Sequence, residues 1–493
     1  VQEHGVLPYP EGTACAEVLL AGEKGGAKAG TVFAGLGIAA VYKFIADGLR
    51  VFPSEVDFEV KSYKGAGIGM DVLPALLGVG YICGVRVASY LLAGGVTAWF
   101  VIMPVIALFG EDAVLYPATV PISELGAWGI WSNYIRYIGA GAVAAGGIFS
   151  LIKALPLIIR TFAQAVRGYG KNMEEESRTS QDIPIRVVLV GILITAIVMW
   201  LIPVIPVNLP GAILIVVLGF FFATVSSRMV GLVGSSNNPV SGMAIATLII
   251  TAAIYKSSGA TAEGMVSSIA VGTIICIIAA MAGDTSQDLK TGYIVGATPK
   301  KQQYGELISV VVSSMAIGGI LYLLNAAWGY GSSELPAPQA TLMKMVVEGV
   351  MGGNLPWNLV FAGVALAVAA EILTIPVLPF AVGLYLPIHL STPMAVGGLV
   401  RLWIEKKRGE EEENQKQMIE SGILYSSGLI AGEGLIGILL AVFAVLPSKR
   451  GGTVGEWLAA AGDRMNFGNI GALIMFVVLI GTLILSIQKG KEK

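Results

Sequence analysis

Apolar segments about as long as a bilayer is thick recur throughout this chain of 493 residues. Clear examples are 187–202, 212–226, 307–324 and 469–487. A helix needs roughly 20 apolar residues to cross the hydrocarbon core of a membrane. Only 13% of the residues are charged, which is about half the share of roughly 25% in soluble domains. The sequence therefore predicts an all-α, polytopic membrane protein that lies in a lipid bilayer.

Glycine is unusually abundant, with 64 residues. Small residues let membrane helices approach closely, so we expect a tightly packed, glycine-rich helical bundle. If the loops rich in Lys and Arg face the cytoplasm, alternation gives roughly 12 spans, plus re-entrant or broken helices. We treat 1–493 as a single transmembrane transporter domain. Because the chain opens at Val1 on a polar motif, we expect that an N-terminal membrane portion is missing or separate.

The sequence also contains a weak internal repeat. Residues 78–95 align without gaps with 381–398, and a Tyr, Ala and Gly pattern aligns 134–146 with 425–437. Glycines coincide at several positions in both blocks. The chain then has two halves, which we place at 1–260 and 261–493.

The loops between these blocks differ in charge. Residues 110–133 contain no Lys or Arg, whereas 405–420 are rich in both. By the positive-inside rule, the two blocks lie in opposite orientations. Inverted repeats are a common plan of secondary transporters, in which the substrate binds at the repeat interface.

Several functional classes lack support in the sequence. The formal net charge of −2 gives no reason to expect nucleic-acid binding. The cysteines Cys15, Cys83 and Cys276 form no CxxC pair, so we interpret them as small apolar residues. The two histidines, His4 and His389, lie in no HExxH motif, which argues against a zinc protease and gives no predicted metal site.

An intramembrane enzyme or a channel is the less favoured reading. An aspartyl intramembrane protease needs a GxGD-type element, but Ala282-Gly283-Asp284 lacks the first glycine of that element and no second motif is present. No filter-like sequence indicates a channel. No Walker A motif indicates ATP-driven transport by this chain alone. We therefore predict that the protein is not an enzyme.

Three polar motifs interrupt the apolar pattern, at 7–17, 231–243 and 283–293. The third follows a charge-free apolar run and is either a membrane-surface loop or a working site. The second cannot continue a lipid-facing helix, because every backbone group must be paired there, so we favour a broken helix over an ordinary loop. The first starts a helix at Glu11, which is either a surface helix or a broken membrane helix.

The polar motifs contain the groups that a peptide carrier needs. A peptide has an ammonium group, a carboxylate and amides, and burying any of these without a partner is costly. Amides can donate and accept, a lysine can pair with a carboxylate, and helix starts after Gly12 and Pro239 would offer free N–H donors. The predicted substrate-binding residues are Glu11, Thr13, Asn237, Asn238, Ser241, Gln287, Lys290 and Tyr293.

Proton coupling needs a carboxylate whose pKa is raised by burial, so that it binds a proton near neutral pH. The predicted candidates are Glu17, Asp284, Asp288 and Glu371, with Glu433 as a further one. Structural roles remain open for two of these residues. Asp284 could pair with Lys290, and Glu371 could stabilise the proline-broken stretch that follows it.

The motifs resemble those of the oligopeptide transporter (OPT) family, in its prokaryotic branch. The matching pieces are 7–17, 137–143, 236–242 and, most specifically, 283–303. The resemblance implies a multi-pass protein of the cell (cytoplasmic or inner) membrane. It also implies proton-coupled uptake of small peptides or peptide-like compounds, with the proton gradient as driving force and no cofactor.

The resemblance leaves the cargo open. Import of a metal–siderophore or other metal–chelate complex is the alternative to peptide uptake, because a metal that arrives chelated needs no ligands from the protein. The resemblance also leaves open the proton stoichiometry, which carboxylate carries the proton, and whether the chain assembles into a homo-oligomer.

Overall fold

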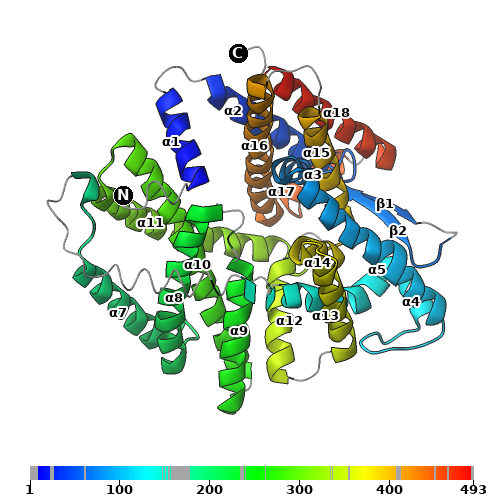
Figure 1. The fold of residues 1–493 in the computed structure, drawn as a ribbon. Coiled ribbons are helices and arrows are strands. Elements are labelled where there is room, and N and C mark those ends of the chain that lie inside the picture. Colours follow the sequence, from blue (N-terminus) through cyan, green and yellow to red (C-terminus); the bar gives the residue numbers. More distant parts are fainter. Residues whose placement is uncertain are drawn as a thin grey trace. The chain divides into compact units, whose positions relative to one another are not determined.

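The computed structural model describes residues 9–22, 27–59, 63–146, 148–149, 152–153, 156, 178–233, 238, 240–260, 262–332, 335, 337–352, 356–406, 412–448, 451–462 and 466–489. Its contacts define two compact units, each assembled from separate segments of the chain (Figure 1). Unit 1 is formed by Val1–Gly25, Ala144–Ile317 and Gln339–Leu355, and unit 2 by Gly26–Val143, Gly318–Pro338 and Pro356–Lys493. The units are defined by contacts, whereas the halves 1–260 and 261–493 concern a sequence repeat and stay a prediction.

Unit 1 is helical throughout its described part, apart from loops. Its helices are α1 (Pro10–Gly22), α7 (Ile185–Leu201), α8 (Leu209–Val233), α9 (Val240–Ser257), α10 (Ala262–Val295), most of α11 (Pro299–Ala327) and α12 (Pro338–Gly352), with a 3-10 turn, η4, at Arg178–Ser180. Helix α10 packs against α8, α9 and α1. The apolar core of unit 1 includes Phe222, Met243 and Ile275. This packing makes α10 the central helix of unit 1.

The described part of unit 2 contains helices and one hairpin. Its elements are α2 (Ala27–Lys43), η1 (Phe44–Gly48), β1 (Glu55–Glu59), β2 (Gly67–Asp71), α3 (Pro74–Val96), η2 (Thr97–Ile102), α4 (Met103–Phe109), α5 (Ile122–Ile130), η3 (Trp131–Ile135), α13 (Trp357–Ile372), α14 (Val377–Tyr385), α15 (Ile388–Glu405), α16 (Glu412–Val445), α17 (Val454–Gly462) and α18 (Gly468–Lys489). The main packing pairs are α3 with α14 and α15, and α2 with α16.

The described part of the chain contains seven helical stretches that are long and apolar enough to cross a membrane. They are Gly30–Gly48, Pro74–Phe109, Leu209–Gly231, Ala262–Val295, Pro299–Ala327, Asn414–Val445 and Gly468–Gln488. Three shorter apolar helices, Arg186–Leu201, Met243–Ser257 and Trp357–Ile372, accompany them. The chain is thus a helical membrane protein, as predicted, while the count of roughly 12 spans stays a prediction.

The start of α8 shows how local sequence sets a helix boundary. Asn208 precedes the helix, and its side-chain oxygen accepts hydrogen bonds from the Gly211 N–H at 3.0 Å and from the Tyr255 hydroxyl at 2.6 Å. Pro210 lies in the first turn, where no intrahelical N–H bond is lost. An Asn cap followed by proline therefore fixes this end of the helix.

Several glycine contacts of unit 2 agree with the alignment of the predicted repeat. A Cβ atom on Gly80 would lie 2.0 Å from the carbonyl oxygen of Met394, and one on Gly383 would lie 2.0 Å from that of Leu91. The alignment of the two blocks pairs Gly80 with Gly383 and Leu91 with Met394. The two contacts are therefore exchanged by the repeat, as expected for two segments related by an approximate two-fold axis.

Two further pairs of aligned glycines make matching close contacts. A Cβ on Gly94 would lie 2.1 Å from the Phe380 carbonyl oxygen, and one on its counterpart Gly397 would lie 2.2 Å from that of Leu77. In the second block, Gly432 approaches α2 at Leu36 and its counterpart Gly141 approaches α13 at Val360, with corresponding distances of 2.2 and 2.1 Å. These contacts agree with the alignment, while the repeat and its inverted orientation in the bilayer stay predictions.

The repeat also contains a break in each copy. Helix α3 is interrupted at Gly84, where φ is 77°, and the aligned position in the second copy is Pro387, which separates α14 from α15. The guanidinium of Arg401 donates to the carbonyls of Ile82 and Tyr81 at 2.7 and 3.3 Å. These contacts satisfy acceptors that the break removes from the helix.

The mixed-charge segment 48–64 has the composition of a loop, but the structure contains a strand there. β1 and β2 pair there as an antiparallel hairpin, with Glu55 opposite Asp71 and Asp57 opposite Gly69. Charged and apolar residues alternate in β1, which is the pattern of a strand with one buried face. The dense charges hid this pattern in the sequence.

Candidate functional site

The polar motif of α10 forms the candidate site of unit 1. The motif lies inside a helix that continues to Val295, so its interpretation as a surface loop was wrong. Gln287 is 7% exposed and faces α1. Its side-chain oxygen accepts a hydrogen bond from the Gly12 N–H at 2.6 Å, and its amide donates to the Glu11 carboxylate at 2.5 Å. One amide thus joins two of the three predicted motifs.

The approach of α1 to α10 depends on glycine. A Cβ on Gly12 would lie 2.4 Å from the backbone oxygen of Gln287. The hydroxyl of Thr291 donates to the Gly12 carbonyl oxygen at 2.8 Å. Because Gln287 and Thr291 are four residues apart, they lie on the same face of α10. The first turn of α1 is therefore held on both its N–H and its carbonyl side.

The prediction that the helix starts after Gly12 and leaves free N–H donors there is wrong, because α1 already begins at Pro10. The Gly12 N–H is already bonded to Gln287, and the Thr13 N–H is bonded to the Tyr9 carbonyl at 2.9 Å. A substrate anion would have to displace Gln287 to reach the first of these groups. The helix start therefore organises the site through its partner side chain.

The second polar motif meets α10 through Asn238. Its amide donates to the Ser226 hydroxyl at 2.7 Å, and that hydroxyl donates to the carbonyl of Ala279. The Asn238 side-chain oxygen is buried and has no hydrogen-bond partner in the described part of the chain. Gly283 lies beside this contact, since a Cβ there would lie 3.4 Å from the Asn238 amide nitrogen, an ordinary contact distance. A buried, unused acceptor therefore lies beside α10.

Gln287, Thr291 and Asn238 form a polar strip beside α10. Hydroxyl groups extend this polar strip along α8 and α10. The Ser227 and Ser286 hydroxyls are 2.6 Å apart, and Ser286 also donates to the Ala282 carbonyl at 2.6 Å. At the C-terminal end of α8 the strip meets Tyr9, whose N–H donates to the Gly231 carbonyl at 3.0 Å. The strip provides polar groups among helices that are otherwise apolar.

The other predicted residues of α10 and its neighbours differ in exposure. Lys290 is 9% exposed and Tyr293 is half-buried, whereas Asp284 and Asp288 are exposed. On a helix, six residues turn the chain well away from the starting face, so Asp284 and Lys290 point in different directions. The pairing of these two residues is therefore not favoured by the helix.

Helix α11 contributes two polar side chains near the end of α10. The Gln302 amide donates to the backbone oxygen of Asp288 at 2.5 Å, and a Cβ on Gly292 would lie 2.1 Å from the Gln302 side-chain oxygen. The Thr285 hydroxyl bonds the Glu306 carboxylate. The end of α10 is thus tied to α11 through an amide and a carboxylate.

The remaining predicted residues are not brought into this site by the described structure. Glu371 lies at the end of α13 in unit 2. Asn237 and the side chains of Glu17 and Ser241 lie outside the described residues. The role of each stays a prediction.

Sequence reasoning missed several residues that build the site. They are Tyr9, Gly12, Ser226, Ser227, Gly231, Ser286 and Thr291. The spacing of Gln287 and Thr291 would have placed both on one face of a helix, had the motif been assigned as helical. The serines of α8 gave no comparable signal, because hydroxyls occur widely in membrane helices.

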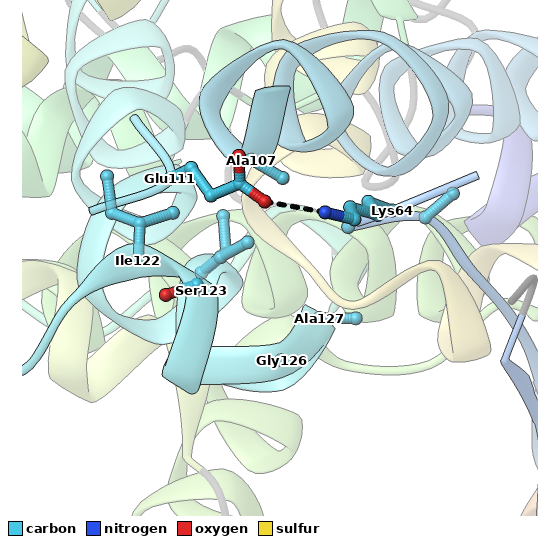
Figure 2. Close-up of a pocket in the computed structure, with 10 residues that line it drawn as sticks. Lys64, Ala107, Glu111, Ile122, Ser123, Gly126 and Ala127 are labelled. Atoms are coloured by element: carbon cyan, nitrogen blue, oxygen red, sulfur yellow. Dashed lines mark hydrogen bonds and ion pairs between the residues drawn. The ribbon is translucent and has the colours of Figure 1, made fainter. Parts of the chain in front are cut away.

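Unit 2 has a separate surface pocket of about 280 Å³, between the segment before β2, α4 and α5. Figure 2 shows Lys64 and Glu111 paired at its edge, with the Lys64 nitrogen 2.6 Å from the Glu111 oxygen. The hydrogen bond from Lys64 lowers the pKa of the Glu111 carboxyl, and both side chains are exposed. An exposed pair of this kind contributes little to stability. No predicted site residue lines this pocket.

Comparison with known proteins identifies the family. Residues 1–444 match the family described as "OPT oligopeptide transporter protein". A Haemophilus influenzae protein named "Putative oligopeptide transporter" is 30% identical, over 92% of this chain and 81% of that protein.

Two plant proteins are more distant relatives. "Probable metal-nicotianamine transporter YSL11" of Oryza sativa subsp. japonica is 24% identical, over 81% of this chain and 59% of that protein. "Metal-nicotianamine transporter YSL3" of Arabidopsis thaliana is 25% identical, over 74% of this chain and 57% of that protein. The chain thus covers less than two thirds of either plant protein. With the family match extending over most of its length, the chain belongs to the oligopeptide transporter family.

Proposed function

We propose that the protein is a secondary active transporter of the cytoplasmic membrane that takes up small oligopeptides or peptide-like compounds with protons. Family membership and the multi-pass helical fold support a carrier rather than an enzyme. The observation that carries the proposal is the polar strip on α10, and above all the unused acceptor of Asn238 among apolar helices. A buried acceptor without a partner is costly, and a substrate N–H group would satisfy it.

The strip offers complementary groups for the two ends and the amides of a peptide. The Asn238 oxygen can accept from a substrate amide or ammonium group. Lys290 is buried on the same helix as Gln287 and carries the charge that suits a substrate carboxylate. Glu11, Thr13 and Tyr293 are proposed to complete the site around these groups, together with Asn237 and Ser241.

The second candidate function is import of a metal–chelate complex. It is favoured by the plant relatives, which are named metal-nicotianamine transporters. Such a complex presents carboxylate and amine groups at its surface, so the same polar strip could bind it. The two functions therefore differ in cargo and share one site.

For proton coupling, Asp284 and Asp288 remain candidates because they lie on the helix that carries the strip. Glu17 and Glu371 remain candidates on sequence grounds. Substrate and proton would be coupled if protonation changed the position of α10 relative to α1.

Uptake into liposomes tests the proposal. The full chain is reconstituted and supplied with a panel of dipeptides, tripeptides, glutathione and an iron–chelate complex, with and without an inward proton gradient. We expect accumulation of at least one class, increased about tenfold or more by the gradient. Flux that equilibrates but never accumulates would contradict secondary active transport. Accumulation of the chelate alone would favour the second candidate function.

A further inference from the structure

A partly buried group of charges lies in unit 2 and includes Glu433, one of the residues predicted to bind protons. The Lys43 ammonium at the end of α2 lies 2.6 Å from the Asp47 carboxylate and 3.5 Å from the Glu433 carboxylate of α16. The other oxygen of Glu433 accepts a hydrogen bond from the Ala75 N–H at 2.6 Å. Ala75 lies in the first turn of α3, where the helix dipole favours a negative charge. One cation thus connects α2, η1, α16 and the start of α3.

Asp71 adds a third carboxylate to this group. It ends β2, three residues before α3 begins, and is 7% exposed. One of its carboxylate oxygens is buried and has no hydrogen-bond partner in the described part of the chain. Lys43 and Glu433 interact electrostatically with it, with opposite signs. Lys43 is already shared by two carboxylates, so an ionised Asp71 would be left with little compensating charge.

The repeat provides an internal comparison for these charges. Gly432 and its counterpart Gly141 make equivalent helix contacts, but the residue after each differs, Glu433 in one copy and Ala142 in the other. Ala142 is 0% exposed, so the same crossing packs well without a charge. Extending the other alignment without gaps pairs Asp71 with Thr374. Helix packing therefore does not require these carboxylates.

We propose that Asp71 is a proton-binding site, whose occupancy is transmitted through Lys43 and Glu433 to the start of α3. For its role in transport the inference rests on the proposed proton coupling, whereas the binding of the proton itself does not. With the proton bound, Asp71 is neutral and the Lys43 ammonium pairs with the carboxylates of Asp47 and Glu433. When the proton leaves, the Asp71 carboxylate competes with Glu433 for Lys43, and Glu433 holds the N-terminal turn of α3.

Electrostatics supports this assignment. Burial, and then the nearby carboxylates of Glu55 and Asp57, raise the pKa of Asp71 from 3.8 to about 7, although Lys43 acts in the opposite direction. A proton is favoured over a metal cation because the Lys43 ammonium already places a positive charge in the group. The titratable groups that face Asp71 or its neighbours are Glu55 and Asp57 on β1, Tyr42 and Lys43 on α2, Asp47 on η1, Glu433 on α16, and His389 on α15, which contacts Asp57.

Infrared spectroscopy of the full chain tests the proposal without any substrate. The carbonyl stretch of a protonated carboxyl group is followed as the pH is raised from 5 to 9, a range chosen around the value of about 7. We expect a band that disappears near neutral pH and is absent from Asp71→Asn. A band of unchanged size in that variant would overturn the proposal.

A second variant keeps the test decisive if Asp71→Asn fails to fold. Glu55→Gln removes an exposed carboxylate opposite Asp71, so the midpoint of the band should move to lower pH. A midpoint that does not move would contradict the assignment. Replacing choline chloride by sodium chloride at constant pH should leave the midpoint unchanged, and a sodium-dependent shift would overturn the choice of a proton.

Thermal stability gives an independent readout. Because folding raises the pKa of Asp71, the folded state binds more protons than the unfolded state between pH 3.8 and about 7. This group's contribution to stability therefore falls as the pH rises through that window, and the fall should be smaller in Asp71→Asn. An equal fall in both proteins would contradict the proposal.

The spectra and the uptake assay separate the two proposals. If the Asp71 band titrates but a proton gradient does not drive uptake, the proton site stands and the proposed coupling fails. If the gradient drives uptake but no Asp71 band titrates, coupling stands and uses another carboxylate, so the inference fails.

Discussion

Replacing Gly383 by valine is expected to abolish accumulation of folded protein. A Cβ at this position would lie 2.0 Å from the Leu91 carbonyl oxygen and 2.9 Å from the Leu91 Cα. Backbone atoms cannot move aside without separating α14 from α3, which pack together along their length. Overpacking of this kind costs roughly 1–3 kcal/mol or more. The measurement is the yield of monodisperse protein in detergent, judged by size-exclusion chromatography.

Matched variants distinguish this effect from a general intolerance of valine. Gly80→Val should be as harmful as Gly383→Val, because the repeat exchanges their contacts. Gly434→Val is the control, since a Cβ on this glycine of α16 meets no atom within 4 Å. Normal yield of Gly383→Val, or equal loss of the control, would show that the α3–α14 contact is not as described.

Exchanging the charge in the contact between α1 and α10 is expected to remove and then restore transport. In Gln287→Glu, two carboxylates would face each other where the Gln287 amide now donates to Glu11 at 2.5 Å. An uncompensated buried charge costs roughly 3–5 kcal/mol, so uptake should fall at least tenfold. The measurement is the initial rate of uptake into liposomes at equal protein content.

The double variant Glu11→Gln with Gln287→Glu provides the rescue. The new carboxylate at position 287 can still accept from the Gly12 N–H, and the new amide at position 11 can donate to it. Uptake should return to within a few-fold of the wild type, which gives a large coupling energy between the two positions. Additive losses would mean that this hydrogen bond does not organise the site.

Much of the fold could be predicted because membrane insertion constrains the sequence so strongly. The apolar runs gave helices such as α8, α10 and α18. The start of α1 was predicted from Glu11 and its neighbours, and the structure begins this helix at Pro10. The glycine pattern predicted close helix contacts, and the structure contains them, for example between Gly80 and Met394. The family resemblance was confirmed over residues 1–444.

Contacts between distant segments could not be predicted in the same way. Glu11 and Gln287 are 276 residues apart, and no local pattern shows that their side chains meet. The burial of Asp71 was hidden because it follows a segment rich in charges, which is typical of an exposed loop. The hairpin and the charged groups of α2 and α16 come together around it only when the chain folds. The sequence identified polar motifs, whereas the partner of each side chain depends on tertiary structure.

Proton entry driven by substrate tests the central claim most directly. Liposomes containing the protein and an internal pH indicator receive a transported substrate from the panel, with no imposed proton gradient. The account predicts acidification of the interior that depends on substrate, is lost in Gln287→Glu and returns in the double variant. Substrate uptake at an unchanged internal pH would contradict proton-coupled transport by this protein.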